Sequence, residues 1–380
     1  MQAPLPSRQS SSCSSQGGLN DSFHSACDHF SPPGSFSEGG VAPELHAIKF
    51  VMLRGEMGER RLRELQREIV NLWRCTHRNV AAIKGIMVIQ HRRQSHLPGN
   101  VQSAPEAYLA IATEFCSGGE LSVALTRGGK DETWFMERFA QLLSAVECLH
   151  SRYQMCHRDL KLENIMLSGP SEEVRVVDFG TSRSMCAQSE ETSDPKSLVG
   201  TYAYMSPEVL GGQGNVPYKG DKADIWSMGV LLYLMRYRDL PFGGVAHCRG
   251  DALAAHASGN PFQVSDRVRR GVFLGPRPNP AAHPLDDLIM RMLERNPPKR
   301  IKVDDIWRHP AMTGYTRWRG NHERAAQAGV QQDPQTAELV FQAASNHVQA
   351  LAMHRQQQQR AYGVDYLGTI LDESFGEEFL

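Results

Sequence analysis

Apolar and polar positions change their spacing along the chain, from runs typical of strands to stripes typical of helices. Three apolar runs, at 45–53, 83–89 and 107–115, predict strands. Between the first two runs, the segment 60–75 places its apolar side chains on one face and predicts a helix. The stripe of that helix consists of Leu65, Ile69, Leu72 and Trp73. We therefore expect order to begin near residue 45, with a small sheet and one helix.

From residue 118 onward the apolar spacing is mostly helical. The segments 132–150, 225–235 and 284–293 predict helices, and the polar segment 91–106 predicts a surface insertion between two strands. The apolar segment at 225–235 is too short to span a bilayer, and we expect it to be a buried helix. Strands that come early and helices that come late indicate an α+β fold, with a small sheet-bearing lobe and a larger helical lobe.

Composition separates both ends of the chain from this middle part, which we expect to fold as one domain at 45–312. Residues 1–44 are rich in Ser, Gly and Pro and are predicted to be disordered. Residues 313–380 are predicted to form a regulatory tail, with an amphipathic helix at 336–353 and an acidic end. The helix stripe consists of Phe341, Ala344, Val348 and Leu351. We expect this helix to dock on the folded domain; a helix that binds another protein, or a weakly ordered tail, is the alternative.

Charge and cysteine content argue against several kinds of partner and site. The 41 basic and 42 acidic side chains nearly cancel, which favours neither nucleic acid nor an anionic membrane as a partner. The eight cysteines include no C-x-x-C pair, which is typical of reduced thiols inside a cell rather than of a zinc site or a disulfide framework. We expect a protein of the cytoplasm, the nucleus or both, acting as a monomer.

The candidate chemistry lies in the segment CHRDLKLENIML at 156–167. Transfer of the γ-phosphoryl group of ATP to a hydroxyl requires a base, metal ligands and cations that face the developing charge. Asp159 can accept the hydroxyl proton, Lys161 can approach the transferred phosphate, and Asn164 can hold a magnesium ion. A second metal ligand, Asp178, follows in the triplet DFG after the strand-like VRVV.

Further motifs follow in a fixed order: GTYAYMSPE at 200–208, DIWSMG at 224–229, and Arg300 in NPPKRI. With these motifs the folded domain resembles eukaryotic protein kinases. The resemblance implies a bilobal α+β fold, with a small antiparallel-sheet lobe at 45–115 and a large helical lobe at 116–312. It also implies ATP and Mg²⁺ as cofactors, with Asn164 and Asp178 as metal ligands, and proteins as substrates.

The same resemblance implies roles for residues around the nucleotide. Lys49 in AIK and Glu68 on the following helix match the ion pair that orients the α and β phosphates in this family. Glu114 and Cys116 lie in the implied hinge, whose backbone meets adenine. Glu120 is placed where it could reach the ribose or a basic side chain of the substrate.

Other motif residues are expected to be structural. The resemblance places His157 against Phe179 and makes Asp224 a cap for the backbone of the catalytic segment. It also predicts a buried ion pair in the helical lobe between Glu208 and Arg300.

The branch of the family is indicated by shorter signals. Lys161, together with Thr201 before SPE, matches the serine/threonine branch. The segments RGE at 54–56, SGGEL at 117–121 and PKSLVGT at 195–201 are similar to those of the plant and algal sucrose-non-fermenting-related kinases of the osmotic-stress branch. Calcium/calmodulin-type kinases share much of this pattern. The resemblance implies a role in stress or nutrient signalling.

Regulation by phosphorylation is also implied, because the resemblance at SDPKSLVGT places a regulatory serine at Ser197 and a second at Ser193. Arg158, directly before Asp159, needs an anion, and a phosphoserine supplies nearly two negative charges. An upstream kinase and a phosphatase would then be partners. The alternative is that both serines are polar residues of a flexible loop.

One part of the family pattern is not recognisable before Lys49. A Gly-rich hairpin that cradles the phosphates is expected there, but PGSFSEGG at 33–40 has the wrong spacing. Either the first strands are missing through an incorrect gene model, or the protein has lost part of its ATP-binding site. A pseudokinase that binds partners is therefore the second interpretation. Retained motif residues favour an active kinase; they are Lys49, Glu68, Asp159, Asn164 and Asp178.

Overall fold

The computed structural model describes most of the predicted folded domain. The described residues are 45–53, 59–91, 106–185, 201–211, 219–243 and 260–320, together with Gln342 and Asn346. Gln342 and Asn346 are helical and exposed, and the Gln342 amide donates to Asn346 Oδ1 at 3.0 Å. The remainder of the predicted tail helix, the predicted disordered segment 1–44 and the predicted insertion between the strands at 92–105 lie outside the described residues.

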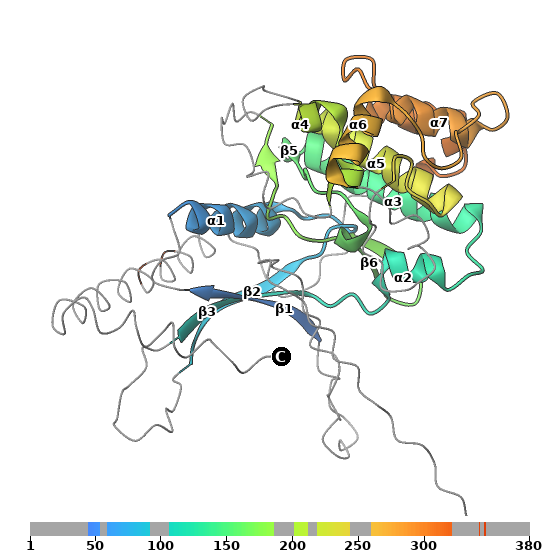
Figure 1. The fold of residues 1–380 in the computed structure, drawn as a ribbon. Helices are drawn as coiled ribbons and strands as arrows, with labels where there is room; N and C mark the ends of the chain where they lie inside the picture. The colour runs from blue at the N-terminus through green and yellow to red at the C-terminus, as the bar shows by residue number, and fades with distance from the viewer. Residues whose placement is uncertain are drawn as a thin grey trace, which may run out of the picture.

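The small lobe is built on an antiparallel sheet, as predicted. Within the described residues its strands are β1 (His46–Leu53), β2 (Ile83–His91) and β3 (Glu106–Glu114), with β3 in the centre. The helix α1 (Glu59–Arg74) lies across one face of the sheet (Figure 1), and its buried stripe joins the same core as the inward strand residues. Alternation along β1 leaves Phe50 exposed and buries Val51, which confirms the strand period.

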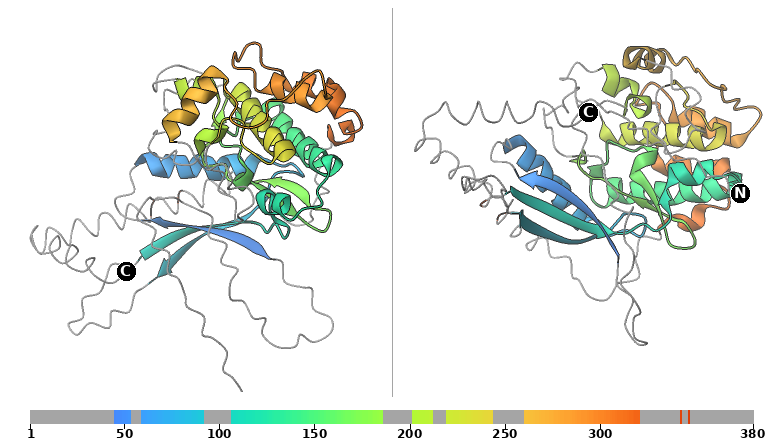
Figure 2. Two further views of the ribbon diagram at one scale, coloured as in Figure 1. Left: turned by 45° about the vertical axis from the view of Figure 1, so that its right-hand side comes forward. Right: turned by 60° about the horizontal axis from the view of Figure 1, so that its bottom comes forward.

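The large lobe is mainly helical, and both views in Figure 2 place the sheet on one side of the molecule and these helices on the other. Its described helices are α2 (Leu121–Thr126), α3 (Glu132–Ser151), α4 (Pro207–Gly211), α5 (Gly220–Tyr237), α6 (Pro261–Arg270), α7 (Pro284–Met292) and α8 (Val303–Arg308). They confirm the predicted helices at 132–150, 225–235 and 284–293. None of the described helices is long and apolar enough to cross a membrane.

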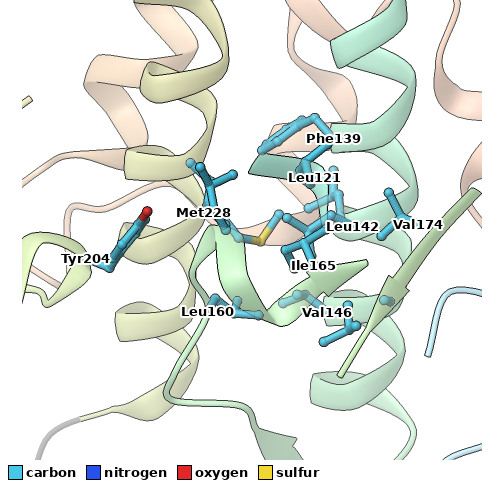
Figure 3. Close-up of a cluster of buried hydrophobic side chains, with 14 of the residues drawn as sticks. Leu121, Phe139, Leu142, Val146, Leu160, Ile165, Val174, Tyr204 and Met228 are labelled. Atoms are coloured by element: carbon cyan, nitrogen blue, oxygen red, sulfur yellow. The ribbon is translucent and has the colours of Figure 1, made fainter. Parts of the chain in front are cut away.

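The core of the large lobe supports the segment that carries the candidate chemistry. Figure 3 shows Leu142 and Val146 of α3 facing Leu160 and Ile165, which lie within that segment, with Met228 of α5 beside them. These five side chains are fully buried. Because protein interiors are packed as densely as crystals, this core fixes the backbone between Leu160 and Ile165.

Short strands in the large lobe were not predicted from the apolar spacing. They are β4 (Gly119–Glu120), β5 (Met155–Cys156), β6 (Ile165–Ser168), β7 (Glu173–Val176) and β8 (Arg183–Ser184), with β4-β6-β7 and β5-β8 as sheets. The large lobe is still mostly helical, as predicted, and the strand-like VRVV overlaps β7; the other short strands were not foreseen. Strands of two to four residues are too short to show a period in the sequence.

Candidate active site

The catalytic segment gathers three of the predicted site residues into one cluster. It runs from β5 through the short 3₁₀ turn Leu162–Asn164 to β6. The Asn164 side-chain amide donates to Asp159 Oδ2 at 3.0 Å and to the Asp159 carbonyl at 2.7 Å. Lys161 Nζ lies 2.8 Å from Asp159 Oδ2. The Asp159 carboxylate is therefore held from two sides.

The cluster shifts the proton affinities of its two charged members. Burial raises the pKa of Asp159, and the Lys161 cation opposes this shift only in part. Burial lowers the pKa of Lys161, but the attraction of Asp159 outweighs burial, so that the pKa of Lys161 is raised. Lys161 therefore stays charged, while Asp159 is a stronger base than an exposed aspartate.

Asp178 lies beside this cluster because β7 runs antiparallel to β6. The Val177 amide donates to the Asn164 carbonyl at 3.0 Å, which places Asp178 next to the catalytic segment. Asp178 has a φ of 62°, and its Oδ1 accepts from the Gly180 amide at 3.2 Å. Asn164 and Asp178 offer amide and carboxylate oxygens, which are the ligands that Mg²⁺ prefers.

Lys49 and Glu68 form the predicted ion pair between β1 and α1. Lys49 Nζ lies 2.8 Å from Glu68 Oε1 and 3.9 Å from Asp178 Oδ1. Burial lowers the pKa of Lys49, but the two carboxylates outweigh burial and raise it. The ammonium group thus stays charged at the junction between the small lobe and the DFG triplet, where a phosphate would bind.

The predicted hinge follows β3, where the chain passes from the small lobe to the large lobe. The Glu114 amide donates to the Ala82 carbonyl at 2.8 Å, whereas the Glu114 carboxylate pairs with Arg175 Nε of β7 at 2.9 Å. Cys116 is buried, and its thiol lies 3.9 Å from the Glu114 carbonyl. Glu120 accepts from the Ser122 hydroxyl at 2.9 Å. The Glu114 carboxylate is therefore engaged by Arg175, and its backbone amide by the Ala82 carbonyl.

Asp224, at the start of α5, caps the catalytic segment as predicted. Its carboxylate accepts from the backbone amides of His157 at 2.9 Å and Arg158 at 2.8 Å, and it lies 2.8 Å from His150 Nε2. Burial opposes ionisation of this side chain, but His150 and the Arg158 amide outweigh burial and lower the pKa of Asp224. This bonding holds Arg158 at a φ of 70°, in the left-handed region.

The other predicted structural pairs are also present. The rings of His157 and Phe179 meet edge to face, with centroids 5.0 Å apart. Arg300 donates to both carboxylate oxygens of Glu208, at 2.7 and 3.0 Å, and its side chain is fully buried.

Sequence reasoning missed two side chains that support the site, His150 and Arg175. His150 lies near the end of α3 and carries no local signal for its contact with Asp224. Arg175 stands at an outward position of β7, where half-buried and buried residues alternate and any polar residue fits; only its partner Glu114 shows its role. The proposed phosphosites Ser193 and Ser197 and the Gly-containing segment at 33–40 lie outside the described residues.

Comparison with known proteins agrees with this geometry. Residues 41–312 match the family described as the protein kinase domain, and the chain belongs to that family, whose members use ATP, usually with Mg²⁺. The fold is accordingly the predicted α+β bilobal kinase fold.

Individual relatives place the chain in the serine/threonine branch. It is 34% identical to "Serine/threonine-protein kinase SRK2A" of Physcomitrium patens over 276 residues, which cover 70% of this chain and 66% of the relative. It is 34% identical to "Serine/threonine-protein kinase SAPK2" of Oryza sativa subsp. indica over 272 residues, covering 70% and 68% of the two chains. The predicted resemblance to the osmotic-stress branch is confirmed. Nothing in these comparisons favours a pseudokinase.

Proposed function

We propose that this protein is a serine/threonine protein kinase that transfers the γ-phosphoryl group of ATP to hydroxyl groups of protein substrates, in stress or nutrient signalling. The cluster of Asp159, Lys161 and Asn164 carries the proposal. It provides a mostly buried carboxylate, a cation 2.8 Å away and an amide bonded to the same carboxylate, in one short loop. The plant relatives with serine/threonine kinase names support the class of substrate.

The roles of the site residues follow from their positions. Asp159 accepts the proton of the substrate hydroxyl, and Lys161 faces the charge that develops on the transferred phosphate. Bound Mg²⁺ would neutralise phosphate charge, and the oxygens of Asn164 and Asp178 are the groups that would hold it. The amide of Asn164 keeps the Asp159 carboxylate in place during the transfer.

The nucleotide would be held between the two lobes. Lys49, fixed by Glu68, is placed to bind the phosphates, while the hinge backbone at Glu114 and Cys116 would face adenine. Transfer of labelled phosphate from Mg-ATP to serine or threonine in a peptide library tests the proposal. A protein that binds Mg-ATP but transfers no phosphate, whether or not its own serines are phosphorylated, would support the pseudokinase interpretation instead.

The pH dependence of transfer should report on Asp159. Because burial raises the pKa of Asp159, the carboxylate form is present at high pH and activity is lost as the pH falls through this raised pKa, above the ordinary value of 3.8. Lys161 opposes the shift, so Lys161→Met should move the acid limb of kcat/KM to higher pH, in addition to lowering the rate. An acid limb at the same pH in both proteins would contradict this assignment.

Ser197→Ala should give a protein with low activity that responds little to a phosphatase, because the variant lacks the main anion that we propose for Arg158. In the parent protein, phosphatase treatment should lower activity by about tenfold or more. Peptide assays before and after treatment, with mass spectrometry of the loop, make the measurement.

Ser193→Ala serves as the comparison for this switch. We propose Ser193 as the second phosphosite, so its variant should retain part of the response to phosphatase. A fully active Ser197→Ala protein without phosphate on the loop would refute the switch.

A further inference from the structure

Four charged side chains of alternating sign form a row that joins the two lobes. Arg78 Nη2 lies 2.7 Å from Glu173 Oε1, Glu173 Oε2 lies 3.3 Å from Arg175 Nη1, and Arg175 Nε lies 2.9 Å from Glu114 Oε1. We call these four residues the charge ladder. Arg78 and Glu114 belong to the small lobe, whereas Glu173 and Arg175 lie on β7 of the large lobe. The ladder thus runs from the small lobe to the large lobe and back.

Backbone hydrogen bonds reinforce the same junction. The Ala81 amide donates to the Val176 carbonyl at 3.0 Å, and the Val176 amide donates to the Asn79 carbonyl at 2.9 Å. On the other side, the Glu114 amide donates to the Ala82 carbonyl at 2.8 Å. The loop 79–82 is therefore fixed between β7 and the hinge.

The central ion pair of the ladder is shielded from solvent. The side chains of Arg175 and Glu114 are 12% and 17% exposed, so salt screens their attraction less than it screens a surface pair. The Ser168 hydroxyl and the Ala82 amide also face the Glu114 carboxylate, at 3.5 and 3.4 Å. These neutral groups cannot balance its charge. Without Arg175, the mostly buried carboxylate would lose this ion pair and would move toward water.

The ladder connects the two ends of the candidate nucleotide site. Glu114 begins the hinge, and Asp178 lies two residues after the end of β7, the strand that carries Arg175. We propose that Arg175 is a positioning residue for the nucleotide: by holding Glu114, it sets the place of the adenine-binding hinge backbone relative to Asp178. This inference rests on the proposed kinase function. Arg175 acts through Glu114 and does not need to touch the nucleotide.

Replacing Arg175 should weaken nucleotide binding and leave the chemical step intact. Arg175→Met should raise the KM for ATP and the Kd for ADP by about tenfold, with kcat changed by less than about twofold. Arg175→Lys, which retains the charge, should recover most of the affinity. The matched control is Lys130→Met, because Lys130 pairs with Glu172 at 2.7 Å, is similarly buried, and lies in the turn before α3. Its KM, Kd and kcat should stay within about twofold of the parent values.

Amide hydrogen exchange in the ligand-free protein tests the same junction without any nucleotide. Arg175→Met should speed exchange at the amides of Ala81 and Glu114 by about fivefold or more, and Lys130→Met should not. Unchanged exchange together with an unchanged Kd, or equal changes in Lys130→Met, would overturn the positioning role. If Arg175→Met does not fold, Glu114→Gln takes its place, because it removes the same ion pair and keeps the side-chain shape.

The two proposals fail in different ways. A parent protein that binds ADP but transfers no phosphate would overturn the kinase function alone, and the Kd comparison would still decide the role of Arg175. A parent protein that binds no ADP would also overturn the kinase function, and the exchange at Ala81 and Glu114 would then decide whether the charge ladder fixes the hinge.

Discussion

Asp159→Asn is expected to lower kcat for peptide phosphorylation by about 10²–10⁴-fold, because an amide cannot accept the proton of the substrate hydroxyl. The Asn164 amide and Lys161 Nζ lie 3.0 and 2.8 Å from Asp159 Oδ2, so the substituted side chain also loses its attraction for the cation. The KM for ATP should change little, since Lys49 and the hinge, rather than Asp159, are proposed to hold the nucleotide. Steady-state kinetics with a peptide substrate measure both quantities.

The folded state must be preserved for this result to bear on the mechanism. Asp159→Asn has nearly the shape of the parent side chain, and the free energy of unfolding should fall by no more than about 1–2 kcal/mol. Asp266→Asn on α6 is the matched control, because this aspartate is 55% exposed and pairs with an arginine on its own helix. The control should keep full activity. A normally folded Asp159→Asn protein with parental kcat would contradict the assignment of Asp159 as the base.

The parts of the site that lie close together in the sequence could be predicted from the sequence. Asp159, Lys161 and Asn164 fall within one short loop, and their types and order, together with DFG and the later motifs, indicated phosphoryl transfer. The pair of Lys49 and Glu68 was predicted from the resemblance to protein kinases, while the periodicity of the two segments indicated only the strand and the helix that carry them. The structure confirms their contact at 2.8 Å.

The contacts that the sequence could not show join elements far apart in the chain. Glu114 and Arg175 are sixty-one positions apart, and the strand that carries Arg175 is four residues long. His150 and Asp224 meet across two helices and are seventy-four positions apart. Periodicity shows which face of an element is buried, but it does not show which polar residues on two different elements meet. Such pairs depend on how the elements pack, and they required the structure.

Arg300→Met is expected to lower the free energy of unfolding by about 3–5 kcal/mol, the largest loss of stability among the variants considered, because it breaks a buried ion pair by removing one partner. The Arg300 side chain is fully buried, and it donates to Glu208, to the Lys222 carbonyl at 2.6 Å and to the Glu294 carbonyl at 2.8 Å. Methionine fills much of the volume but satisfies none of these acceptors. Chemical denaturation followed by circular dichroism measures the loss.

Arg291→Met provides the matched control, since Arg291 also pairs with a carboxylate at 2.9 Å but its side chain is 58% exposed. After the substitution, water takes the place of the arginine beside the carboxylate, so the free energy of unfolding should fall by no more than about 0.5 kcal/mol.

The loss of stability in Glu208→Gln should fall between those of Arg300→Met and Arg291→Met, because Arg300 keeps its bonds to backbone carbonyls while losing the opposite charge. Equal costs for Arg300→Met and Arg291→Met would show that burial adds nothing to this pair, and the structural role of Arg300 would have to be abandoned.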